Sequence, residues 1–134
     1  MDHGDFIAPD AAEVERLALA ALEALPEIFR THANAVVLRV EDFADEAMLA
    51  EMGIADPFGL TGLYEGVPMT EKSVSDQPER ADVIWLFRRP ILDEWIARGD
   101  VSLGALVGHV YVHELAHHFG WSDDDIAAID EWWT

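Results

Sequence analysis

Histidine and glutamate residues suited to metal chemistry are concentrated in one short segment of the chain. His113, Glu114 and His117 form an H-E-x-x-H pattern. On a helix, a spacing of four places both imidazoles on one face, one turn apart, where they can bind the same ion. Glu114 projects about 100° away from His113, so it can reach a water on the metal without being a ligand. This pattern predicts hydrolysis, in which zinc lowers the pKa of the water to about 7 and Glu114 is the general base.

A catalytic zinc needs a third protein ligand and one open position. Asp123 is our choice, because Gly120 lets the chain leave the helix and turn back, and Asp123 follows His117 by six residues. Asp124 and Asp125 are the alternatives. Any of the three could instead cap a last helix, and one carboxylate could do both.

The alternative to a metal site is a cluster of histidines with ordinary partners in the core or at the surface. The motif lies in the most apolar segment of the chain, where an unpaired carboxylate would cost several kcal/mol. A metal and its water would explain why Glu114 is there. His109 shares the face of the motif but lies two turns, roughly 12 Å, from His117, so we expect a pocket or core residue. His118 is expected to point aside, toward solvent or an acidic neighbour.

Length and charge exclude several classes of protein. The 134 residues suit one domain, residues 1–134, with one modest core. The formal net charge of -19 repels phosphate backbones and anionic membranes, so neither nucleic acid nor a membrane is an expected partner. There are no cysteines, and the acidic N-terminal segment does not resemble a signal peptide. We therefore expect a cytoplasmic protein; its oligomeric state is left open.

The remaining segments predict an α+β fold: a small mixed β-sheet packed with helices, with the active-site helix near the C-terminus. Turn residues and apolar periodicity place the elements in this order: a helix from Asp10 to Pro26, a strand at 35–42, a short helix at 43–53, an extended piece at 61–68, a strand at 82–87, a helix from Pro90 to Gly99, a helix at 101–119 and a last helix from Ser122 or Asp123 to Trp133.

The segment 101–119 is apolar nearly all round, which predicts a central helix. Asp100 is the expected N-cap, and Gly120 the expected C-terminal stop. Gly104 and Gly108, one turn apart, would let another element approach closely; equally, they are two glycines that the helix tolerates.

The longer pattern H-E-x-x-H-x-x-G-x-x-D, which ends at Asp123, resembles the metzincin zinc-peptidase signature with Asp in place of the last His. All four methionines precede the motif, so the methionine turn that follows it in metzincins is absent. Three segments in this order resemble the minimal zincins, a family of small bacterial zinc metallopeptidases: GLYEGVP (62–68), IWLFRRP (84–90) and the GHVYVHELAHHFG helix (108–120).

This resemblance implies a compact zincin-like fold with zinc on the penultimate helix. Carried over by position, His113, His117 and Asp123 would be the zinc ligands and Glu114 the base. The substrate would be a peptide or protein.

In zincins generally, the substrate pairs with a sheet-edge strand beside the active helix, and Gly62 to Val67 is the candidate strand here. Tyr64 could donate a hydrogen bond to an oxyanion, or it could be a half-buried packing residue. Trp121 could form a wall of the substrate pocket, or it could pack under the last helix.

The leading functional hypothesis is therefore a zinc-dependent metallopeptidase. The alternative is a non-catalytic metal-binding module on the same fold that binds a protein partner, which the acidic composition permits. Hydrolysis of nucleic acid is disfavoured by the net charge.

Overall fold

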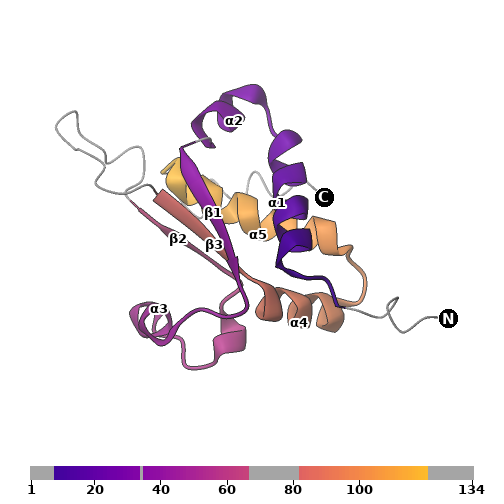
Figure 1. The fold of residues 1–134 in the computed structure, drawn as a ribbon, viewed down its shortest axis with the longest axis vertical. Coiled ribbons are helices and arrows are strands. Elements are labelled where there is room, and N and C mark those ends of the chain that lie inside the picture. The colour runs from indigo at the N-terminus through magenta and orange to yellow at the C-terminus, as the bar shows by residue number, and fades with distance from the viewer. Residues whose placement is uncertain (1–7, 34, 67–81, 121–134) are drawn as a thin grey trace.

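The chain forms a three-stranded sheet flanked by helices in the computed structural model, which describes residues 8–33, 35–66 and 82–120 (Figure 1). This arrangement confirms the predicted α+β class with a small mixed sheet. The elements are α1 (Ala11–Glu23), α2 (Glu27–Ala33), β1 (Val36–Glu41), α3 (Glu46–Met52), the 3-10 helix η2 (Pro57–Gly59), β2 (Gly62–Glu65), β3 (Asp82–Phe87), α4 (Arg88–Arg98) and α5 (Leu103–His118). The predicted last helix lies outside the described residues.

Helix boundaries follow the capping residues. The Asp10 carboxylate accepts a hydrogen bond from the backbone of Glu13 at 2.9 Å and begins α1 as predicted. The carboxylate of Asp45 caps α3 in the same way, which is why that helix starts later than residue 43. Gly53 ends α3 with φ of 67°, a left-handed conformation that favours glycine.

The predicted cap of the central helix was wrong. Ser102, not Asp100, is the N-cap of α5, and its hydroxyl accepts a hydrogen bond from the Ala105 backbone at 3.0 Å. The Trp95 indole donates to the Val101 carbonyl at 3.0 Å and so holds the preceding loop against α4. This contact fixes the chain just before Ser102, so the helix begins after the serine.

The strand order is β1-β3-β2, so β2 lies at an edge of the sheet. β1 runs parallel to β3, and β2 runs antiparallel to it, with Tyr64 opposite Ile84. The strand predicted at 82–87 is confirmed residue for residue, and the extended piece beginning at Thr61 contains β2. The predicted edge strand is therefore at an edge, and it packs against α5.

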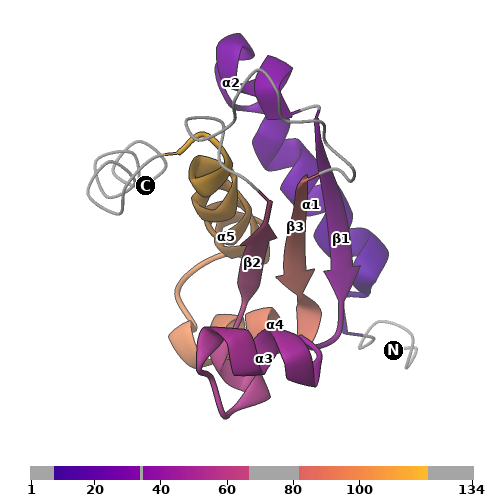
Figure 2. The ribbon, with the colours of Figure 1, turned by 90° about the vertical axis from the view of Figure 1, so that its left-hand side faces the viewer.

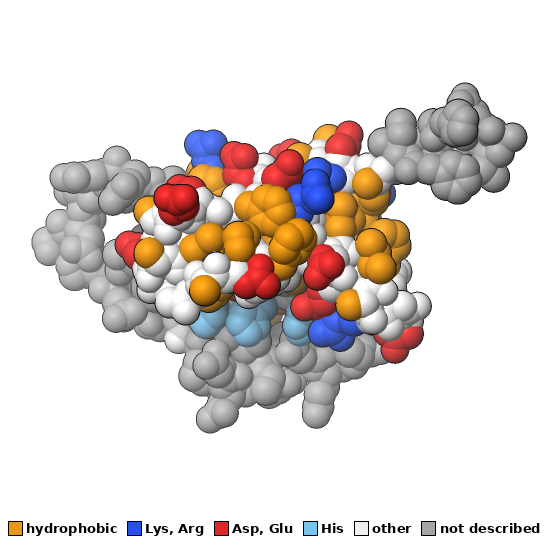
Figure 3. Space-filling view, turned by 90° about the horizontal axis from the view of Figure 1, so that it is seen from below, with side chains coloured by type: hydrophobic (Ala, Val, Ile, Leu, Met, Phe, Trp, Pro, Cys, Tyr) orange, Lys and Arg blue, Asp and Glu red, His pale blue; other side chains and the backbone are white. Residues whose placement is uncertain are grey.

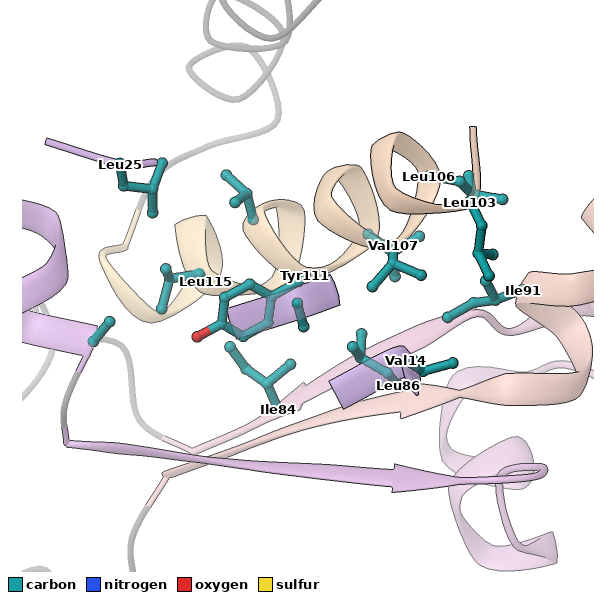
Figure 4. Packing of buried hydrophobic residues seen from close by; sticks show 14 of the residues in the cluster. Val14, Leu25, Ile84, Leu86, Ile91, Leu103, Leu106, Val107, Tyr111 and Leu115 are labelled. Atoms are coloured by element: carbon teal, nitrogen blue, oxygen red, sulfur yellow. The ribbon is translucent and has the colours of Figure 1, made fainter. Parts of the chain in front are cut away.

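The main core lies between the sheet and the helices α1 and α5. Figure 2 views the sheet with α1 and α5 behind it. The buried side chains of β3 on this side, Ile84 and Leu86, meet Val107, Tyr111 and Leu115 of α5 (Figure 4). The central position expected for α5 is confirmed, since most of its residues are buried.

Gly104 of α5 faces α1 but has room for a methyl group, so the contact between these helices does not require a glycine there. A Cβ built at Gly104 would lie 3.4 Å from the Leu17 side chain of α1, within ordinary contact distance. A second, smaller apolar cluster covers part of the other sheet face, where Leu63 and Phe87 meet Leu49 of α3. Among the described residues, every helix is too short or too polar to span a bilayer.

Candidate metal centre

His113 and His117 lie one turn apart on α5, with ring centroids 5.1 Å apart and ring planes at 76°. Both side chains are half-buried. Figure 3 shows histidine side chains gathered together on one face of the molecule. The central helix thus brings two imidazoles to the surface at one place, close enough to converge on a single ion.

His109 extends this row by one more turn. Its ring centroid lies 6.4 Å from that of His113, and its side chain is half-buried. Its expected role as a pocket or core residue remains a prediction.

Glu114 follows His113 on α5 and is half-buried, like the two histidines. Burial raises the pKa of its carboxyl from 4.5 to about 7, and a hydrogen bond from the Tyr64 backbone opposes part of this rise. A carboxyl with a pKa near neutrality can both accept and release a proton at physiological pH. The environment of Glu114 therefore suits a general base.

Gly62 of β2 lets the edge strand come close to this carboxyl. A Cβ built at Gly62 would lie 2.7 Å from Val110 Cγ1 and 3.3 Å from Glu114 Cγ. Distances this short leave no room for a side chain. A glycine at this position is what allows α5 to lie against β2 at the level of Glu114.

A third ligand is not found in the part of the chain that the structure describes. Within residues 8–33, 35–66 and 82–120, no three His, Asp or Glu side chains form a group that could hold a metal. Asp123, its alternatives Asp124 and Asp125, and Trp121 all lie outside these ranges. Their roles remain predictions.

A buried hydrogen-bonded cluster joins the last turn of α5 to the sheet. The Asp82 carboxylate lies 2.9 Å from His118 Nδ1 and accepts a hydrogen bond from the Tyr64 hydroxyl at 2.8 Å. His118 is only 3% exposed, so of its two expected environments the acidic neighbour is correct and solvent is wrong. Tyr64 is half-buried, as expected for a packing residue. Its contact with an oxyanion remains a prediction.

The roles of Asp82 in the buried cluster and of Gly62 in the packing of β2 against α5 were not predicted from the sequence. A signal for Asp82 was present: it shares the inward parity of Ile84 and Leu86 at the start of an apolar strand, where a carboxylate needs a buried partner. Gly62 carried a weaker signal, as a glycine within an extended segment often marks close approach of another element.

The residues that the structure describes include two of the three predicted protein ligands of a catalytic zinc site. Two imidazoles on one helix face are typical zinc donors, and the Glu114 carboxyl, whose pKa burial raises, lies next to them in the chain. An α+β fold with such a helix beside an antiparallel edge strand is consistent with the zincin-like class.

The sequence comparison agrees with this class. The model of the zincin-like metallopeptidase family matches residues 33–133, and the chain belongs to that family. No curated protein matches the chain. The family match covers the whole sheet and α5, and it extends over the segment that contains Asp123.

Proposed function

We propose that this protein is a zinc-dependent peptidase in which Glu114 activates the attacking water. The observation that carries the proposal is the desolvated Glu114 carboxyl, with a pKa raised to about 7, on the same helix as the His113/His117 pair. Membership of the zincin-like metallopeptidase family supports zinc as the metal and a peptide or protein as the substrate.

Each residue of the proposed site has a separate role. His113 and His117 would supply two nitrogen ligands, and Asp123 is proposed as the third. Zinc, when bound, supplies Lewis acidity that polarises the peptide carbonyl and lowers the pKa of a water. The Glu114 carboxylate takes the proton of the attacking water and delivers it to the nitrogen of the leaving amine.

The edge strand β2 is proposed as the place where the substrate backbone pairs. Among the described strands it lies at the edge of the sheet, and it packs against α5, so a peptide along the side of β2 opposite β3 would pass close to Glu114. Trp121 is proposed as a wall of the substrate pocket. The Tyr64 hydroxyl donates to Asp82, so its predicted contact with an oxyanion is not part of this proposal.

The test is a quenched-fluorescence peptide library, with zinc content measured on the same samples. Glu114→Gln keeps the size of the side chain and removes the base. We expect it to retain zinc and to lose at least about 100-fold in kcat, because general-base catalysis contributes about 10²–10⁴-fold. Glu15→Gln, at an exposed position of α1, is the matched control and should keep full activity.

Two results would count against the proposal. If a His113→Ala, His117→Ala double variant binds zinc as the wild type does, the metal site is elsewhere. If the zinc-loaded wild type cleaves no member of the library, the non-catalytic binding module replaces the peptidase as the best description.

A further inference from the structure

The cluster of Tyr64, Asp82 and His118 brings together three separate elements. Tyr64 is in β2, Asp82 begins β3 and His118 ends α5. A single oxygen, Asp82 Oδ2, lies within hydrogen-bond distance of both partners, and the Tyr64 hydroxyl lies 3.3 Å from His118 Nδ1. Asp82 and His118 are 7% and 3% exposed, so this polar cluster belongs to the interior.

Stability alone is a poor explanation for such a cluster. Buried polar and ionic groups lose their hydration, and well-packed apolar residues of similar volume are often as stabilising. Hydrogen bonds differ from apolar contacts in being directional, because they require particular atoms at particular distances. Gly66 also approaches Asp82 closely: a Cβ built there would lie 2.8 Å from Asp82 Cβ. The surroundings thus confine the carboxylate to one place.

The same cluster is connected both to His117, a proposed zinc ligand, and to Glu114, the proposed base. His118 follows His117, and consecutive helical residues differ by about 100° in direction. Holding the His118 ring in the interior therefore fixes the rotation of the last helical turn, and with it the direction of the His117 imidazole. This turn needs such a contact, since helix ends open more readily than helix centres.

Tyr64 provides the connection to Glu114. Its hydroxyl donates to Asp82, while its backbone hydrogen-bonds the Glu114 carboxyl. One residue of the edge strand thus contacts both the buried cluster and the proposed base. A shift of β2 relative to α5 would disturb both contacts together.

We propose that the Tyr64–Asp82–His118 cluster is a positioning device that holds the last turn of α5 against β2. It keeps the His117 imidazole and the Glu114 carboxyl in fixed relation to each other. The effect on catalysis rests on the proposed function, whereas the effect on the helix turn does not. Misplacement of a catalytic group by about 1 Å can reduce a rate about 100-fold, so a device of this kind has a measurable effect.

The experiment compares two tyrosine variants. Tyr64→Phe removes the hydroxyl of the cluster and keeps the ring and the backbone. Tyr111→Phe is the matched control, because Tyr111 is the other tyrosine of the chain and is buried in α5, only 3% exposed. Three kinds of measurement are made on each variant: zinc affinity by competition with a chromogenic chelator, steady-state kinetics (kcat and KM), and amide hydrogen exchange of residues 115–118 in the metal-free protein.

We expect Tyr64→Phe to weaken zinc binding about tenfold, in line with residues that orient ligands, and to lower kcat with little change in KM. Amide exchange in the last turn of α5 should be at least about tenfold faster than in the wild type. Tyr111→Phe should change none of the three. Asp82→Asn combined with Tyr64→Phe should lose no more zinc affinity than Asp82→Asn alone, because both changes act on the same hydrogen bond.

The positioning role is overturned if Tyr64→Phe and Asp82→Asn keep wild-type zinc affinity and wild-type exchange in residues 115–118. Failure of the peptidase proposal gives a different result. If the wild type binds zinc but cleaves nothing, the affinity and exchange measurements still decide the role of the cluster. If the wild type binds no zinc, exchange in the metal-free protein decides it.

Discussion

Replacement of Gly62 by alanine tests the packing of the active helix against the edge strand. The new Cβ would lie 2.7 Å from Val110 Cγ1 and 3.3 Å from both Glu114 Cγ and the Trp85 carbonyl oxygen. Val110 cannot easily move aside, because a β-branched side chain in a helix has one strongly preferred rotamer and this one is buried. The overlap must therefore be relieved by separating β2 from α5.

The size of the effect follows from this overlap. Overpacking of this kind costs about 1–3 kcal/mol, and we expect about 2 kcal/mol for Gly62→Ala. In a chain of this length that lowers the Tm by roughly 7 °C. The shift also displaces Glu114, so kcat/KM should fall at least about tenfold.

The assay is thermal and urea denaturation of the metal-free protein, followed by activity on the best peptide from the library. Gly104→Ala is the control, since its Cβ would meet Leu17 at an ordinary 3.4 Å. Alanine is a better helix former than glycine, and this variant should gain about 0.5–1 kcal/mol. A Gly62→Ala protein as stable and as active as the wild type would refute the packing argument.

Three further predictions concern Glu114, Asp123 and the start of α5. A buried carboxyl whose pKa is raised to about 7 stabilises the fold fully below its ordinary pKa of 4.5, and this contribution is lost as the pH rises through 7. In urea denaturation of the metal-free protein, the stability of the wild type relative to Glu114→Gln should therefore fall by about 3 kcal/mol between pH 4.5 and pH 7.5; a difference independent of pH contradicts the burial. Asp123→Asn should weaken zinc binding, measured by chelator competition, by far more than about 100-fold with little change in metal-free stability; wild-type affinity would make Asp123 a cap and place the third ligand at Asp124, Asp125 or elsewhere. Ser102→Ala should cost about 1 kcal/mol in thermal denaturation as the loss of an N-cap, whereas Asp100→Ala should cost nothing measurable; the reverse order would contradict the observed cap.

Features that depend on local spacing were predictable from the sequence. The helix start at Asp10, the strand at 82–87 and the central helix each follow from a cap, an apolar run or a periodicity that neighbouring residues define. The facing histidines follow from a spacing of four on that helix. The start of α5 was misplaced because the Trp95 indole fixes Val101, a contact that no local rule contains.

Contacts between particular side chains far apart in the chain were not predictable. Tyr64 and His118 are 54 residues apart, and Asp82 and His118 are 36 apart. No rule of local sequence spacing predicts a contact between residues so far apart in the sequence. They meet because β2 turns back antiparallel to β3 and α5 crosses the same side of the sheet.

The difference between these two kinds of contact has a consequence for folding. His113 and His117 need only one helical turn to lie on the same face, so the pair would already be in place in a chain with a partly formed α5. The burial of Glu114 needs β2 in place, which requires long-range contacts that form later. A zinc ion held by this pair would therefore also bind the unfolded ensemble, and it would raise the Tm by less than its affinity for the native protein alone would give. Metal retention after heating would thus report whether the helical turn with His113 and His117 has formed. Recovery of activity would report whether β2 has returned to its place in the sheet.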